Sequence, residues 1–179
     1  MKVERMRQER GDAGRARSKA RMAAVQALYQ MELAGTDVAE VIEEFQSLRF
    51  RPDDQMADND DADSAPAAAS LANADETFFS EILHGVIRRQ REIDPLVHEQ
   101  LADGWKLVRV DSILRAILRA GAFELLDRTD VPARVAINEY INVAHAFFSE
   151  DEPRVVNGVL DKLGRRLRPD EFEAKARPA

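Results

Sequence analysis

The chain has 179 residues, of which 45% are hydrophobic and 33% charged, and its formal net charge is −7. This length suits one domain, with or without an unstructured insertion, and argues against a multidomain enzyme. The eight glycines and the single Trp and two Tyr residues argue against a turn-rich β-sandwich or barrel. Because cysteine is absent, a disulfide framework, a thiolate metal site and a cysteine nucleophile are all excluded.

The sequence carries no signal for a membrane or for export. No apolar run approaches the roughly 20 residues that are needed to cross a bilayer. The N-terminus is charged and polar and lacks the apolar core of a signal peptide. We therefore expect a cytoplasmic protein that has no membrane contact.

The charges are unevenly distributed along the chain. Residues 1–21 contain eight basic and three acidic residues, whereas residues 53–76 contain eight acidic residues and no Lys or Arg. Without that acidic stretch the chain carries a net charge of +1. The negative total therefore does not exclude a polyanionic partner for the basic N-terminal part.

The first half of the chain predicts two helices between segments without regular structure. Residues 1–14 contain two glycines among charges and no apolar face, so we expect a flexible basic arm. Apolar residues spaced by three and four predict a helix over residues 15–34 and a second one from Asp37 to about Pro52. The stretch 52–75 is rich in Asp, Ala and Ser and has almost no large apolar residues, which predicts a disordered acidic insert.

The second half predicts helices throughout. A broad apolar face predicts a central helix over residues 76–92, and Asp94 followed by Pro95 predicts the start of a short helix that ends before Gly104. Further helices are expected from Asp111, after Pro132 and after Pro153, and residues 169–179 are expected to form a flexible tail. No segment of the sequence predicts a strand. Seven short helices with brief links favour a compact all-α bundle.

The residues that catalysis or cofactor binding would need are not arranged for either role. Each of the three histidines lies on a different predicted helix, without a ligand-type partner four residues away. The glycines are scattered singly, so no phosphate-binding loop can be built from them. We therefore expect no metal, no cofactor and no enzymatic activity.

A basic cluster stands in the opening turns of the first predicted helix: Arg15, Arg17, Lys19 and Arg21. Cations spaced by four repel one another, and they oppose the helix dipole, which favours acidic groups at an N-terminus. Phosphate binding would relieve both effects, and a solvated, solubilising segment is the alternative interpretation. Tyr29, two to three turns further on, either offers a stacking ring to single-stranded RNA or lies at the edge of the core.

Four stretches of the sequence resemble the NusB family of bacterial transcription antitermination factors. They are the strings from Arg15 to Tyr29, from Asp111 to Leu125, from Asp130 to Glu139 and from Val156 to Lys162. Together they extend over essentially the whole chain except the acidic insert and both tails. Several motifs in the right order make this resemblance specific.

The resemblance implies two small helical subdomains and a single RNA-binding domain over residues 15–168, interrupted by the insert. It also implies a non-enzymatic role in transcription antitermination. NusB-like proteins pair with the ribosomal protein NusE, and the pair binds the boxA element of nascent RNA. The bound complex helps the RNA polymerase elongation complex to pass terminators, chiefly in ribosomal RNA operons.

The resemblance also implies which side chains contact RNA. Motif matching gives Arg15, Arg17, Lys19, Arg21, Gln26, Tyr29 and Phe147. For Phe147, packing in the core is the alternative. Two departures from the family pattern concern the same contacts: Ser18 interrupts the basic run, and Phe148 stands where the family often has Gly.

Other functions stay open at this point. One alternative is a helical adapter for protein interaction or ribosome assembly that lacks sequence-specific RNA binding and can form a homodimer. A DNA-binding repressor would need a basic recognition helix after a tight turn, which the sequence does not contain. The sequence does not identify the face that binds a protein partner.

Overall fold

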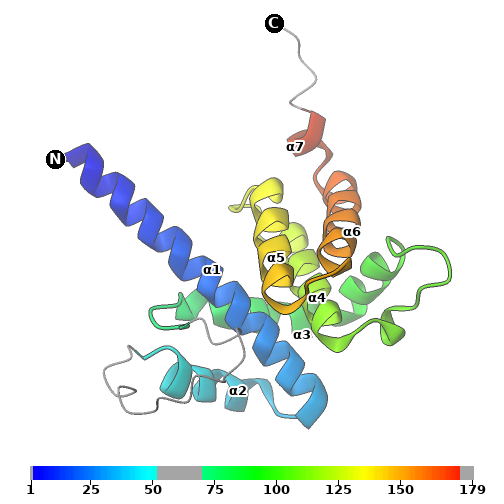
Figure 1. Cartoon of the computed structure of the whole chain (residues 1–179), viewed down its shortest axis with the longest axis horizontal. Coiled ribbons are helices and arrows are strands. Elements are labelled where there is room, and N and C mark those ends of the chain that lie inside the picture. The colour runs from blue at the N-terminus through cyan, green and yellow to red at the C-terminus, as the bar shows by residue number, and fades with distance from the viewer. Residues whose placement is uncertain (1, 52–69, 174–179) are drawn as a thin grey trace, which may run out of the picture. The chain divides into compact units, whose positions relative to one another are not determined.

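The computed structural model describes residues 2–51 and 70–173, and all regular structure in these residues is helical (Figure 1). The all-α prediction is therefore confirmed. Residues 52–69 of the predicted acidic insert lie outside the described residues. The chain forms two compact units, Met1–Leu83 and His84–Ala179, as the resemblance implies. No helix in the described part of the chain is long and apolar enough to cross a membrane.

The first unit contains α1 (Lys2–Ala34), α2 (Val38–Glu44), the π-helix η1 (Phe45–Arg49) and the first turns of α3 (Glu76–His98). Its core contains three aromatic rings, those of Phe45, Phe50 and Phe79, with centroids 5.0–6.2 Å apart. α1 ends at Gly35, which has a φ of 67° and donates its N–H to the Met31 carbonyl at 2.9 Å.

Helix α1 begins at Lys2, well before the predicted start at residue 15. The sequence predicted a flexible arm because glycines at 11 and 14 weaken a helix. In the structure Arg5 pairs with Glu9 at 3.1 Å, and Arg15 pairs with Asp12. Ion pairs spaced by three and four residues stabilise a helix, and these two lie on either side of Gly11. The basic arm is therefore a helical extension of α1.

Residues 70–75 of the predicted insert belong to the described structure. Leu71, Ala72 and Ala74 are buried, and the Asn73 N–H donates to the Phe50 carbonyl at 3.3 Å. The prediction extended the insert to residue 75 because the stretch has almost no large apolar residues. Leu71 is one of two large apolar residues in the stretch, and its burial orders the residues that lead into α3.

The second unit is built around α4 (Ser112–Asp127), α5 (Ala133–Phe147) and α6 (Glu152–Leu167), which pack against one another. Two glycines allow close packing here. A Cβ at Gly121 would lie 2.6 Å from Leu160 Cδ1, and a Cβ at Gly85 would lie 2.1 Å from the Phe123 ring. The short 3-10 helix η2 (Leu107–Arg109) leads into α4.

The predicted short helix after Asp94 is wrong, because α3 continues through Pro95 to His98. Asp94 does not act as a helix cap. Its two carboxylate oxygens accept hydrogen bonds from Arg119 Nε and Nη2, both at 2.8 Å. The Glu99 N–H donates to the Pro95 carbonyl at 3.0 Å, so the hydrogen-bond pattern resumes after the proline. The bidentate contact, which depends on a residue 25 positions away, overrides the local start signal.

Residues 169–173 of the predicted flexible tail form the short helix α7 (Pro169–Glu173), which packs on α6. Phe172 is buried, and the guanidinium carbons of Arg134 and Arg165 lie 4.9 and 5.0 Å from its ring centroid. Glu171 Oε2 accepts the Ala133 N–H at 2.6 Å and so caps α5. Residues 174–179 lie outside the described residues.

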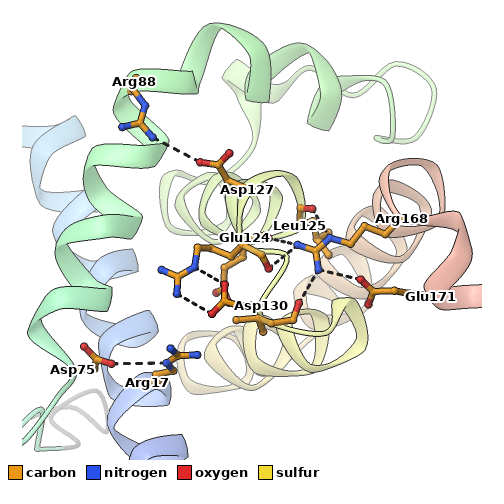
Figure 2. A network of polar contacts seen from close by, with 11 residues as sticks. Arg17, Asp75, Arg88, Glu124, Leu125, Asp127, Asp130, Arg168 and Glu171 are labelled. Atoms are coloured by element: carbon orange, nitrogen blue, oxygen red, sulfur yellow. Dashed lines mark hydrogen bonds and ion pairs between the residues drawn. The ribbon is translucent and has the colours of Figure 1, made fainter.

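Arg168, just before α7, is the centre of a buried polar network (Figure 2). Its side chain is only 7% exposed. The guanidinium donates to four backbone carbonyls at 2.7–2.8 Å, those of Glu124, Leu125, Arg128 and Val131. Arg168 therefore ties the end of α6 to the C-terminal end of α4 and to the loop that follows it.

Candidate nucleic-acid interface

Most basic side chains of the first unit are carried by α1. Four of them are exposed and two are half-buried: Arg5, Arg7, Arg10 and Arg15, then Arg17 and Lys19. Because α1 is helical from Lys2, Arg7, Arg10 and Arg17 lie on one side of it at i, i+3 and i+10. Arg7 and Arg10 were not among the predicted RNA contacts, because residues 1–14 were expected to form a flexible arm. The signal that could have found them is the basic excess of residues 1–21.

Arg17 lies in the middle of α1, beside the first turn of α3. Its Nε atom is 3.8 Å from Asp75 Oδ2 (Figure 2), and its guanidinium carbon is 5.0 Å from the Phe78 ring centroid. The side chain is 39% exposed. A phosphate group can therefore reach it from solvent.

Arg21, which motif matching gives as an RNA contact, is buried. It is only 3% exposed, and its guanidinium carbon lies 5.0 Å from the centroid of the same Phe78 ring. Cation–π contact with a buried ring stabilises the first unit. In this position Arg21 supports the fold around Phe78 and does not present its charge to solvent.

Lys19 and Arg15 lie on another side of α1 from Arg17. Lys19 Nζ donates to the Ala72 carbonyl at 2.6 Å, in a partly buried contact that holds the segment before α3. Arg15 is exposed and pairs with Asp12 within the helix. Of the four predicted cations, Arg15 is thus the most accessible, and Arg17 and Lys19 are partly accessible.

The other predicted RNA contacts are divided between the two units. Gln26 and Tyr29 are half-buried and, at a spacing of three residues, lie on one side of α1. Gln26 Oε1 is buried and has no hydrogen-bond partner in the part of the chain that the structure describes. Phe147 belongs to the second unit, at the C-terminal end of α5, and is half-buried.

The described residues contain no group of three His, Asp or Glu side chains that could hold a metal ion. His84 and His98 on α3 and His145 on α5 are all exposed. The prediction that each histidine lies on a different helix is wrong for His84 and His98, because α3 continues through Pro95 and contains both.

An apolar groove lies in the second unit. Its volume is about 160 Å³, and it is lined by Gln100, Leu101, Ala102, Trp105, Val155, Gly158, Val159 and Lys162. Trp105 is 50% exposed, and Val108, three residues further along the chain, is 77% exposed. Exposed aromatic and aliphatic side chains beside a groove are typical of protein-interaction surfaces.

A cationic first helix and an apolar groove define the class: a helical binding protein. The chain belongs to the NusB family, whose model matches residues 18–165. It is 49% identical over 152 residues to the transcription antitermination protein NusB of Allorhizobium ampelinum, covering 85% of this chain and 88% of that protein. It is 47% identical to the protein of the same name from Rhodopseudomonas palustris, covering 87% of this chain and 83% of the relative. This is a family of antitermination factors and not of enzymes.

Solved structures of the family share the fold. NusB of T. maritima is similar with a TM-score of 0.66 and 26% identity, over 88% of this chain and 96% of that one. A second structure contains the antitermination factors NusB and NusE in complex with double-stranded RNA. Its matching chain has a TM-score of 0.62 and 23% identity, over 85% of this chain and 98% of that one. At this identity the second match supports the fold alone.

Proposed function

We propose that this chain binds boxA-type single-stranded RNA together with a NusE-type ribosomal protein and so promotes transcription of ribosomal RNA operons. It acts in the cytoplasm and contacts the RNA polymerase elongation complex indirectly. The observation that carries the RNA part is the set of exposed and half-buried cations on α1, from Arg7 to Lys19. Family membership and the name of the relatives support the antitermination role.

In this proposal affinity and selectivity come from different groups. Arg15, Arg17 and Lys19 neutralise backbone phosphates, which gives affinity without reading the sequence. Arg7 and Arg10 extend the same charged helix beyond the predicted set. The aromatic rings of Tyr29 and Phe147 and the amide of Gln26 are suited to stacking on bases and to hydrogen bonding with their edges.

For the protein partner, the proposal places a NusE-type protein on the groove beside Trp105. The groove is apolar, and a half-exposed Trp at its edge has the character of an interface hot spot. A related solved structure contains NusB with NusE. A homodimer through the same groove is the competing use of this surface, and sedimentation of the chain with and without NusE separates the two.

The test is a titration of a short boxA-type RNA and a scrambled RNA, each with and without NusE, at two salt concentrations. Selective binding that NusE strengthens, and that falls when Arg15 and Arg17 become Ala, is the expected result. Arg91→Ala is the matched control, since Arg91 is exposed on α3 in the second unit. Weak and equal binding to both RNAs, unaffected by NusE, would contradict the proposal and favour a protein-interaction bundle.

A further inference from the structure

Asp75 is held beside the basic helix by backbone contacts that do not involve any cation. Its N–H donates to the Ala16 carbonyl of α1 at 3.0 Å, and its Oδ1 accepts the Phe78 N–H at 2.9 Å as the cap of α3. These two bonds fix both the backbone and the carboxylate of Asp75. The second oxygen, Oδ2, is thereby placed 3.8 Å from Arg17 Nε.

The contact between Asp75 and Arg17 is an exchangeable ion pair. Its nitrogen–oxygen separation of 3.8 Å is too long for a hydrogen bond, and the two side chains are 33% and 39% exposed. Ion pairs of this kind contribute little to stability, because water and salt screen them. An RNA phosphate, which makes charge-assisted hydrogen bonds to arginine, is thus able to displace the carboxylate.

The position of Arg17 does not depend on Asp75 alone. Its guanidinium carbon also lies 5.0 Å from the centroid of the Phe78 ring, which Arg21 contacts from the same helix. Arg17 therefore stays at the surface of α1 when the carboxylate loses its charge. Under this arrangement the main effect of Asp75 on a bound RNA is electrostatic.

We propose that Asp75 is an internal competitor of the RNA backbone, which occupies Arg17 in the free protein and lowers the RNA affinity of α1. The inference rests on the proposed function and adds a residue outside α1 that sets the strength of RNA binding. A phosphate at Arg17 must either displace Asp75 or lie close to its negative charge. This electrostatic penalty applies to any RNA sequence. Base contacts and the protein partner therefore supply a larger share of the binding free energy.

The test compares Asp75→Asn with Asp37→Asn in the full chain. Asparagine is as good a helix cap as aspartate, so Asp75→Asn removes the charge and keeps the capping oxygen. Asp37 caps α2 in the same way, with Oδ1 accepting the Ala39 N–H at 2.9 Å, and it follows the C-terminal end of α1, whereas Asp75 lies beside the middle of that helix. Both variants change the net charge equally. Each is titrated with boxA-type and scrambled single-stranded RNA over a series of salt concentrations.

We expect Asp75→Asn to bind both RNAs about two- to fivefold more tightly at low salt, the range that a partly exposed ion pair supports. The plot of log affinity against log salt should also steepen by up to about 0.7, because the Asp75 carboxylate no longer offsets the phosphate contact at Arg17. Asp37→Asn should match the wild type.

Three results would overturn the inference while wild-type RNA binding stands. The first is an RNA affinity of Asp75→Asn that equals that of the wild type. The second is a weaker affinity of Asp75→Asn, which would make Asp75 a positioning residue. The third is an equal gain of affinity in both variants, which would reflect net charge alone. A thermal melt of Asp75→Asn that matches the wild type shows that the cap is intact. A wild-type chain that binds neither RNA would instead refute the proposed function.

Discussion

Replacement of Arg168 by Ala tests how much the buried guanidinium, which links the end of α6 to α4, contributes to stability. The side chain donates to four backbone carbonyls at 2.7–2.8 Å and lies 3.3 Å from Glu171 Oε1. Alanine removes all of these donors and leaves the carbonyls in a region that solvent hardly reaches.

The expected loss of stability follows from the burial of this group. A hydrogen bond from a charged donor contributes about 1.5–3 kcal/mol, but several bonds from one group are not additive. Removing one side of a buried charged contact typically costs about 3–5 kcal/mol. We therefore expect Arg168→Ala to lower the free energy of unfolding by about 3 kcal/mol or more, out of a typical total of about 5–15 kcal/mol.

The assay is urea unfolding followed by tryptophan fluorescence. Trp105 is the single tryptophan of the chain and lies in the second unit, so its signal reports the unit that contains Arg168. With a slope of about 2 kcal/mol per molar urea, the midpoint should fall by about 1.5 M. Arg166→Ala is the control, because Arg166 pairs with Glu99 at the surface and its loss should shift the midpoint little. A change below about 1 kcal/mol in Arg168→Ala would refute the reasoning, since so small a value is typical of surface substitutions.

Three further predictions concern the binding surfaces and the packing. The double variant Arg15→Ala with Arg17→Ala should bind RNA more weakly at low salt. In the RNA titration, the slope of log affinity against log salt should fall by about 0.7 per lost phosphate contact. An unchanged slope would contradict phosphate binding by these side chains. Trp105→Ala should weaken NusE binding, measured by calorimetry, by about thirtyfold, as for a hot-spot residue (about 2 kcal/mol), and leave RNA binding without NusE unchanged. Equal NusE affinity would place the partner elsewhere. Gly121→Ala should lower the free energy of unfolding of the second unit by about 1–3 kcal/mol in urea, because a Cβ there meets Leu160 Cδ1 at 2.6 Å. An unfolding midpoint equal to that of the wild type would show that Leu160 moves aside at no cost.

The helices of the second unit could be read from the sequence because their signals are local. The expected starts at Asp111, after Pro132 and after Pro153 agree to within one or two residues with α4, α5 and α6, which begin at residues 112, 133 and 152. Apolar residues at helical spacing identify the buried side of each helix, and a cap or a proline marks its start within a few residues. The basic excess at the N-terminus and the family motifs likewise depend on residues close together in the chain.

The errors arise where a distant contact overrides a local signal. Pro95 lies inside α3 because Arg119, 25 residues away from Asp94, binds the carboxylate that would otherwise cap a new helix. Residues 169–173 are ordered because Phe172 is buried between two arginines from α5 and α6. Neither contact can be inferred from the composition of the segment itself.

By itself the sequence determined that the protein is helical, where most helices begin, and that its cations gather on the first of them. Only the tertiary structure decided how those cations are used. It buries Arg21 against Phe78, holds Lys19 on the Ala72 carbonyl and places Arg17 beside Asp75, 58 positions further along the chain. The physical reason is that helix formation depends on neighbours within one or two turns, whereas the exposure and charge environment of a side chain depend on segments that meet only on folding.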